Sequence, residues 1–205
     1  MSASTPQDPA SPPAEPDTAL SDDDVVAVLA RQHRRIRALF AELFGEDGRD
    51  ARHHCFWELR TLLVVHETAE QLVVRPVSTP LVPPDLAERR GMEEKEATLL
   101  LADLEDIDVG CEEFDARLAQ LESIVLGHLR AEEIEEFAPL VEHTSEDDRI
   151  RMGRRVIAAE RLAPTRPHPG LSGSPPRPLA TLGPPAAIID RVRDAVAEGR
   201  SGSPD

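Results

Sequence analysis

Two copies of the spacing His-x-x-x-Glu are the residues of this sequence best suited to chemistry. They are His66 with Glu70 and His128 with Glu132. Residues four apart on a helix lie one turn apart on one face, so each pair offers an imidazole nitrogen and a carboxylate oxygen within about 6 Å of each other. Mixed ligands of this kind suit iron or manganese better than structural zinc, and a carboxylate can bridge two metal ions about 3.5 to 4 Å apart. The two pairs therefore indicate a metal site.

Both pairs fall on the apolar faces of predicted helices. Residues on these faces step by three and four, the spacing of a face that is turned towards partner helices. The three faces are Val26, Leu29, His33, Ile36, Phe40 and Leu43; then Phe56, Leu59, Leu63, His66, Glu70, Val73 and Val77; then Phe114, Leu118, Leu121, Val125, His128 and Glu132. His33 is therefore expected inside, together with the two pairs.

Imidazoles and carboxylates in a dry core need partners, because an uncompensated buried charge is strongly destabilising. The sequence pattern puts no Lys or Arg on the same faces, and Lys95 is offset from the inward face of its own helix. A bound cation is the simplest neutraliser. We therefore predict a non-haem site for two iron ions, with manganese as the less favoured metal.

A further ligand is expected between residues 85 and 106. The inward face of that helix makes Glu94 the residue best placed to face the site, with Glu93 as the fallback. The competing interpretation is that both are solvated surface acids. Glu67, beside His66, is an alternative ligand. The acidic run of Glu132, Glu133, Glu135 and Glu136 is expected to face solvent except for Glu132.

The elements that must position these residues are helices. The pattern predicts them at residues 21–44, 52–77, 85–106 and 112–141, with a shorter fifth at 145–162. Long helices with short connections favour an all-α, antiparallel up-down-up-down four-helix bundle. Ser21 is expected to cap the first helix.

The flanking segments differ from this helical unit, which we place at residues 21–162. Residues 1–20 hold five prolines and are expected to form a disordered tail. Residues 163–205 are expected to form a Pro-rich strap with a short terminal helix. In that helix Ile188, Ile189, Val192 and Val196 have helical spacing and could dock on the bundle.

Composition narrows the functional classes. A formal net charge of −16 repels phosphate backbones and argues against nucleic acid as a partner. No apolar run is long enough for a membrane span, and the N-terminus lacks the features of a secretory signal, so we expect a cytoplasmic monomer. Cys55 and Cys111 have no partner spacing, which gives a zinc knuckle no support. The absence of Tyr removes a tyrosyl-radical role.

The site residues give the chain a resemblance to a known family. It resembles hemerythrin-like proteins of the HHE cation-binding type over about residues 22 to 142. That family has a lone His on helix one, HxxxE on helix two, a His on helix three and HxxxE on helix four, around a non-haem di-iron centre. This chain offers, in that order, His33, then His66 and Glu70 in VVHETAEQLVVRP, then Glu94 in MEEKEATLLLADLE, then His128 and Glu132 in GHLRAEEIEEFAPL. It departs from the family where Glu94 stands in place of the helix-three His.

The resemblance implies a protein that binds a small ligand, namely oxygen, peroxide or nitric oxide, for sensing, scavenging or detoxification. A carboxylate in place of an imidazole adds negative charge and favours the ferric state, which argues against reversible oxygen carriage. Whether the protein is an enzyme stays open. The alternatives are a ferroxidase and a metal-ordered regulatory module that meets a protein partner through its C-terminal extension.

Overall fold

All regular structure in the described part of the chain is helical. The computed structural model describes residues 20–162, 189–194 and 196–197, and the all-α prediction is confirmed for them. The elements are α1 (Val25–Gly45), α2 (Arg49–Ala69), the π-helical turn η1 (Glu70–Val74), α3 (Arg75–Ser78), the 3-10 turn η2 (Thr79–Leu81), α4 (Pro84–Glu105), α5 (Glu112–Glu135), α6 (Phe137–His143) and α7 (Glu146–Leu162). The predicted tail, apart from residue 20, and most of the predicted strap lie outside the described residues.

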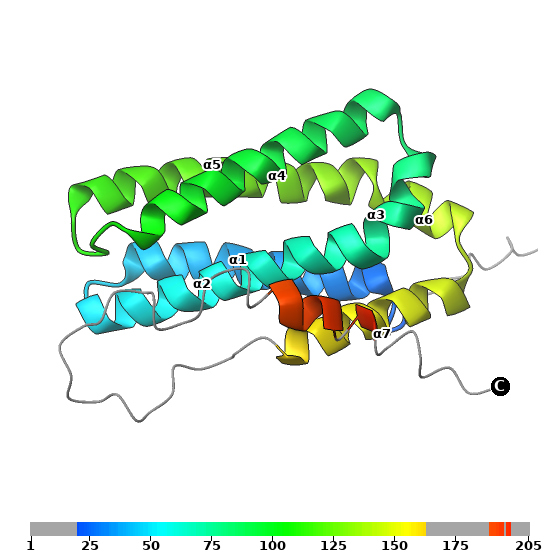
Figure 1. Cartoon of the computed structure of the whole chain (residues 1–205), viewed down its shortest axis with the longest axis horizontal. Helices are drawn as coiled ribbons and strands as arrows, with labels where there is room; N and C mark the ends of the chain where they lie inside the picture. The colour runs from blue at the N-terminus through cyan, green and yellow to red at the C-terminus, as the bar shows by residue number, and fades with distance from the viewer. Residues whose placement is uncertain (1–19, 163–188, 195, 198–205) are drawn as a thin grey trace, which may run out of the picture.

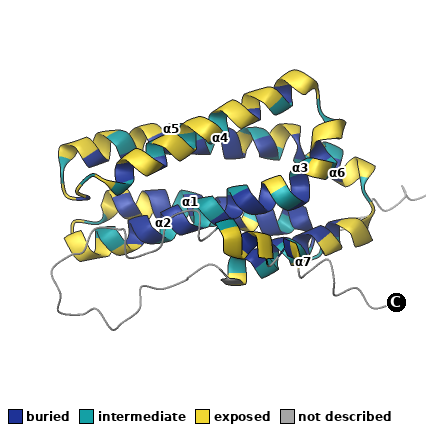
Figure 2. Cartoon of the chain, in the orientation of Figure 1, coloured by how far each residue is buried: buried dark blue, intermediate teal, exposed yellow. Residues whose placement is uncertain are grey.

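The helices associate in two groups. α4 and α5 pack along each other, while α1 packs against both α2 and α7, and α1 also contacts α5 (Figure 1). Buried residues gather on the faces that these helices turn towards one another, and exposed residues cover the outer faces (Figure 2). No described helix is both long enough and apolar enough to cross a membrane.

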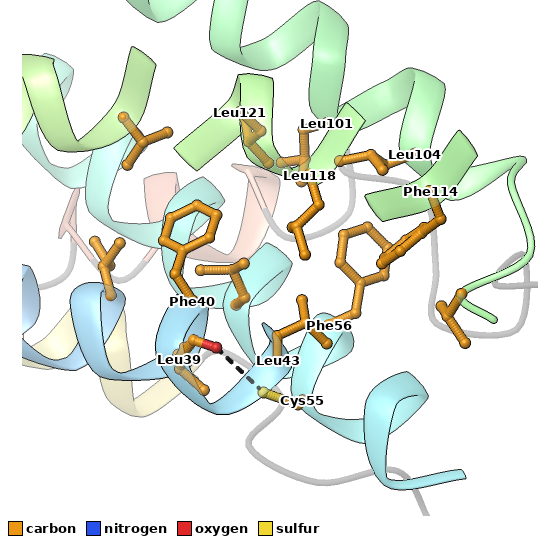
Figure 3. Packing of buried hydrophobic residues seen from close by; sticks show 14 of the residues in the cluster. Leu39, Phe40, Leu43, Cys55, Phe56, Leu101, Leu104, Phe114, Leu118 and Leu121 are labelled. Atoms are coloured by element: carbon orange, nitrogen blue, oxygen red, sulfur yellow. Dashed lines mark hydrogen bonds between the residues drawn. The ribbon is translucent and has the colours of Figure 1, made fainter. Parts of the chain in front are cut away.

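Two apolar clusters stabilise this arrangement. The first cluster joins α1, α2, α4 and α5 around Leu39, and in it the rings of Phe56 and Phe114 meet edge to face with centroids 5.1 Å apart (Figure 3). Cys55 also lies there; its thiol donates to the carbonyl oxygen of Leu39 across 3.5 Å, and burial raises its pKa to about 11. Fully burying one of the Leu or Phe side chains of this cluster stabilises the fold by about 1.5 to 3 kcal/mol.

The second cluster lies around Val28 on α1 and draws on α2, η1 and α7. It also includes Val192 and Val196, so two residues of the C-terminal extension are packed into the core. On α1, His33 separates the residues of the second cluster from those of the first. The candidate site therefore lies where the two apolar clusters meet.

The beginning of α1 differs from the prediction. The helix starts at Val25, and its N-cap is Asp24 rather than Ser21. The Asp24 carboxylate is fully buried, accepts a hydrogen bond from the Val26 N–H at 3.0 Å and receives Arg149 Nε of α7 at 2.7 Å. A partner that is distant in sequence thus makes Asp24 the better cap.

The hydrophobic pattern does not reveal two interruptions, of which a proline explains the first. A single helix over residues 112–141 is wrong, because α5 ends at Glu135 and α6 follows from Phe137. The ring of Pro139 conflicts with the carbonyl four residues earlier, which is that of Glu135. The helix predicted at 52–77 starts earlier, at Arg49, and changes to a π-helical turn at Glu70, six residues before Pro76.

Candidate metal centre

Three histidines from three helices meet between the two helical groups. His33 comes from α1, His66 from α2 and His128 from α5, and their exposed fractions are 0%, 3% and 7%. The rings of His33 and His66 lie edge to face with centroids 5.0 Å apart. The predicted burial of all three side chains is therefore confirmed.

Each imidazole has one nitrogen held by an oxygen atom. The Nδ1 atom of His33 lies 2.9 Å from Glu133 Oε1, that of His66 lies 2.9 Å from Gln32 Oε1, and that of His128 lies 3.1 Å from Glu93 Oε2. These oxygens can only accept, so Nδ1 donates in every case. When a neutral ring donates from Nδ1, the lone pair stays on Nε2, which is how metal-binding histidines are oriented.

Two carboxylates complete an inner group, which we define as His33, His66, Glu70 and Glu132. One ligand atom from each residue can be chosen so that all four lie within 4.8 Å of one another. Both carboxylates are almost fully buried, at 3% and 2% exposed. The Oε2 atom of Glu132 lies 3.5 Å from His33 Nε2, while its Oε1 atom lies 3.0 Å from His128 Nε2. Glu132 therefore lies between two of the histidines.

A second set lies beside it on the α4 side, the cavity-side group of Glu67, Glu94 and His128. Their ligand atoms also lie within 4.8 Å of one another. Glu94, the residue predicted to face the site, is thus brought to His128, whereas the fallback Glu93 holds the Nδ1 atom of that ring. The sequence predicts Glu67 only as an alternative ligand, and the one feature that indicates this role is its position beside His66.

The donor atoms of the inner group fit a cation. Nε2 of His33, Nε2 of His66, Oε2 of Glu70 and Oε2 of Glu132 are buried and have no hydrogen-bond partner among the residues that the structure describes. Buried polar atoms without partners are rare and costly unless something else binds them. Lone pairs from imidazole and carboxylate that converge within a few ångströms form a donor set suited to iron or manganese.

Arg75 corrects the prediction that no basic residue reaches these carboxylates. Its Nη2 atom lies 3.0 Å from Glu132 Oε1 and 3.9 Å from Glu70 Oε2, and it also donates to Glu94. Its Nη1 atom lies 3.1 Å from Glu136 Oε2. The guanidinium, 17% exposed, thus borders the site and neutralises part of its negative charge.

The π-helical turn explains why the pattern missed Arg75. In an α-helix five residues turn through about 500°, which places residue i+5 some 140° away from residue i. In η1 the Arg75 N–H instead bonds to the carbonyl of Glu70, five residues earlier. The wider turn brings Arg75 above Glu70, and such turns are frequent at functional sites.

The acidic run at the end of α5 is less solvated than predicted. Glu136 is only 6% exposed and is paired with Arg75, and Glu133 holds His33 while also pairing with Arg37 at 2.9 Å. The expectation that only Glu132 faces inward is therefore wrong for Glu136. The change from α5 to α6 at this point alters the direction of the chain, which a uniform helical repeat cannot anticipate.

Burial and neighbouring charges shift the pKa values of the titratable groups of the site in opposite directions. Burial lowers the pKa of His66 to about 3 and raises the pKa of Glu67 to about 8, the latter also through Glu94. Burial alone would lower the pKa of His128, but its contacts with Glu132 and Glu93 outweigh burial and raise it to about 9. Glu132 responds in the opposite sense: burial opposes its charge, and His128 holds its pKa below the usual value.

Burial, together with the nearby charge of Glu132, raises the pKa of Glu70 well above its ordinary value. Two carboxylates so close together resist simultaneous ionisation unless a cation lies between them.

The remaining histidines lie away from this centre. His53 is partly buried on α2, and His54 and His143 are exposed. His168 lies outside the described residues. Both cysteines are free thiols, Cys55 buried and Cys111 half-buried.

Comparisons with protein-family models, with curated proteins and with solved structures find no match to this chain. The interpretation of the site therefore rests on the geometry and chemistry of its own residues.

Proposed function

We propose that this chain is a non-haem di-iron protein of the hemerythrin-like HHE kind, in which α1, α2, α4 and α5 act as a four-helix bundle around the metal ions. Its function is to bind oxygen, peroxide or nitric oxide for sensing, scavenging or detoxification in the cytoplasm. The observation that carries the proposal is the shared orientation of the three histidines. Each has Nδ1 held by an oxygen and Nε2 turned towards a buried carboxylate.

The ligands divide between the two groups. One ion is assigned to the inner group and the other to the cavity-side group, with Glu132 between them because its two oxygens approach His33 and His128 separately. Iron held there would supply one-electron redox chemistry towards small diatomic molecules and peroxide.

The residues around the ligands have their own tasks in this proposal. Glu133, Gln32 and Glu93 fix the tautomer and the ring orientation of the histidines, as outer partners do in metal sites. Arg75 offsets the carboxylate charge that the metal ions leave uncompensated. Phe137, whose ring stacks on His33 with centroids 5.5 Å apart, shields the inner group from water.

Loading the protein with iron tests the proposal. We expect anaerobic reconstitution followed by oxidation to give about two irons per chain and the near-ultraviolet absorption of a diferric centre. Glu70→Ala should lose most of the iron, because it removes a buried donor of the inner group. Glu88→Ala, an exposed acid on α4, is the matched control and should bind iron as the wild type does. A wild-type protein that remains colourless and free of iron would contradict the proposal.

The alternatives give different results in the same preparation. A ferroxidase would oxidise added ferrous iron over many turnovers and release it. A regulatory module acting through the C-terminal extension is less favoured, because Val192 and Val196 are buried in the core rather than presented to a partner.

A further inference from the structure

A cavity of about 220 Å³ opens directly beside the cavity-side group. It lies between α2 on one side and α4 and α5 on the other. Its walls are mostly apolar and include Leu63, Val64, Ala97, Leu101, Leu121 and Val125. Ile189, from the C-terminal extension, also lines it.

The cavity is much larger than the proposed diatomic ligand requires. A water molecule occupies about 30 Å³ in the liquid, and an engineered protein cavity of about 150 Å³ lined by Leu, Ile and Phe stays dry and binds benzene. An apolar space of the present size that held only a diatomic molecule would leave most of its lining without contacts, which is unfavourable. Its size and its walls are suited to a larger organic molecule.

The polar end of the cavity restricts the chemistry of that molecule. His66 and His128 line this end and are almost fully buried, and Nε2 of His66 has no hydrogen-bond partner among the described residues. Glu67 and Glu94 also line the cavity at this end. A hydroxyl group can donate to a carboxylate, whereas a charged group would have to leave water for mostly apolar walls.

We propose that the cavity is a binding site for an uncharged organic molecule about the size of a substituted benzene ring, with a single hydroxyl group turned towards Glu67, Glu94 and His128. This goes beyond the proposed function, because the apolar walls of the cavity, and not the metal ions, provide most of the contacts to the ligand. The hydroxyl end lies beside the candidate metal centre, and the apolar body lies between α2, α4 and α5.

Benzyl alcohol is the probe, with toluene and benzoate as its uncharged and anionic relatives. We expect saturable one-to-one binding of benzyl alcohol to the full chain, measured by calorimetry both as purified and after chelation of metal. Toluene should bind too, and benzoate should bind at least about tenfold more weakly than benzyl alcohol. Benzoate binding as tightly as the alcohol, or an absence of saturable binding by the alcohol, would overturn the proposal.

Filling the cavity tests its location. Ala97→Leu puts a larger side chain into the space and should weaken benzyl alcohol binding by about tenfold or more, while it keeps or raises the melting temperature. Ala116→Leu makes the same change on the exposed face of α5 and should leave binding unaltered. Val125→Ile adds only one methylene on the opposite wall and serves if Ala97→Leu does not fold. Folded variants that bind the alcohol as the wild type does would refute the assignment.

The two proposals fail independently. If the chain binds no iron but binds benzyl alcohol at this cavity, only the di-iron function is lost. If it binds iron but no alcohol, only the organic ligand is lost.

Discussion

Arg75 is the residue on which the charge balance of the metal-free site depends. It contacts Glu132, Glu94 and Glu136. Removing the guanidinium of Arg75 leaves these buried carboxylates without a counter-charge, a change that typically costs about 3 to 5 kcal/mol. We expect Arg75→Gln to lower the stability of the metal-free protein by roughly 3 kcal/mol and that of the iron-loaded protein by less, because metal ions take over part of the neutralisation.

The measurement is urea unfolding with chelator and with bound metal. Arg35→Gln is the control, because Arg35 is 42% exposed and pairs with Glu42 and Glu58 on the surface. An exposed pair contributes about 0 to 1 kcal/mol. If both substitutions cost the same in the metal-free protein, Arg75 is not an internal counter-ion.

The stability of the metal-free protein should fall as pH rises from 6.5 to 8. Burial raises the pKa of Glu67 from 4.5 to about 8, and contacts with Glu132 raise that of His128 from 6.5 to about 9. In this window the folded state holds protons that the unfolded state has lost, so each group costs up to about 1.4 kcal/mol per pH unit. His66 acts in the opposite direction, and only below pH 6.5, because its folded pKa is lowered to about 3.

Melting temperatures with chelator across this window measure the effect. Glu67 faces Glu94 of α4 as well as His128 and Glu132 of α5. Glu67→Gln cannot release a proton and should therefore show a smaller decline than the wild type. Metal binding requires the same protons to leave, so metal affinity should rise with pH. A stability that rises between pH 6.5 and 8 would be incompatible with these shifts.

Part of the site could be predicted residue by residue. The inward positions of His33, His66 and His128 follow from apolar steps of three and four, and their burial confirms that reasoning. Their roles as ligands remain predictions. Arg75 could not be found in this way, because it reaches Glu70 only through a π-helical turn.

At the scale of elements, the contact between α7 and the start of α1 depends on Gly153. A Cβ atom at this position would lie 1.9 Å from the carbonyl oxygen of Asp23 and 2.9 Å from the backbone nitrogen of Val25. Backbone atoms cannot yield as a flexible side chain does. We expect Gly153→Ala to lower the free energy of unfolding by about 1 to 3 kcal/mol or more.

Gly91→Ala is expected to change the free energy of unfolding in the opposite direction. A Cβ at Gly91 on α4 meets nothing within 4 Å, so the substitution should stabilise by about 1 kcal/mol through helix propensity. Denaturant titration of both variants distinguishes the two cases. A harmless Gly153→Ala would mean that α7 does not approach α1 this closely.

Most helices were predictable from the sequence, and their ends were less so. The helix at 85–106 lies within one residue of α4, because Pro84 provides a strong local start. The end of α5 depends on Pro139, whose effect acts four residues upstream, and the cap of α1 depends on Arg149. Helix ends that depend on such distant residues can be placed only when the contacts of those residues are known.

On the scale of the whole molecule, negative charge and apolar packing are arranged around one region. The chain has 39 acidic and 23 basic residues, which raises the local concentration of cations near its surface. The inner group lies between the two apolar clusters, in a region where charge is poorly screened. The cavity does not follow from periodicity, because it depends on how distant segments pack. The burial of Val192 and Val196 agrees with the helical spacing of the apolar residues in the C-terminal extension.

The membership of the two clusters also sets the order in which a chain made from its N-terminus can acquire its core. Every buried residue of the cluster around Leu39 has been synthesised once Leu129 has left the ribosome. The cluster around Val28 includes Val192 and Val196, so on a growing chain it stays incomplete until these two residues have emerged. Because His33 separates the two clusters on α1, one of the two apolar clusters beside the candidate site is completed only when Val192 and Val196 have emerged.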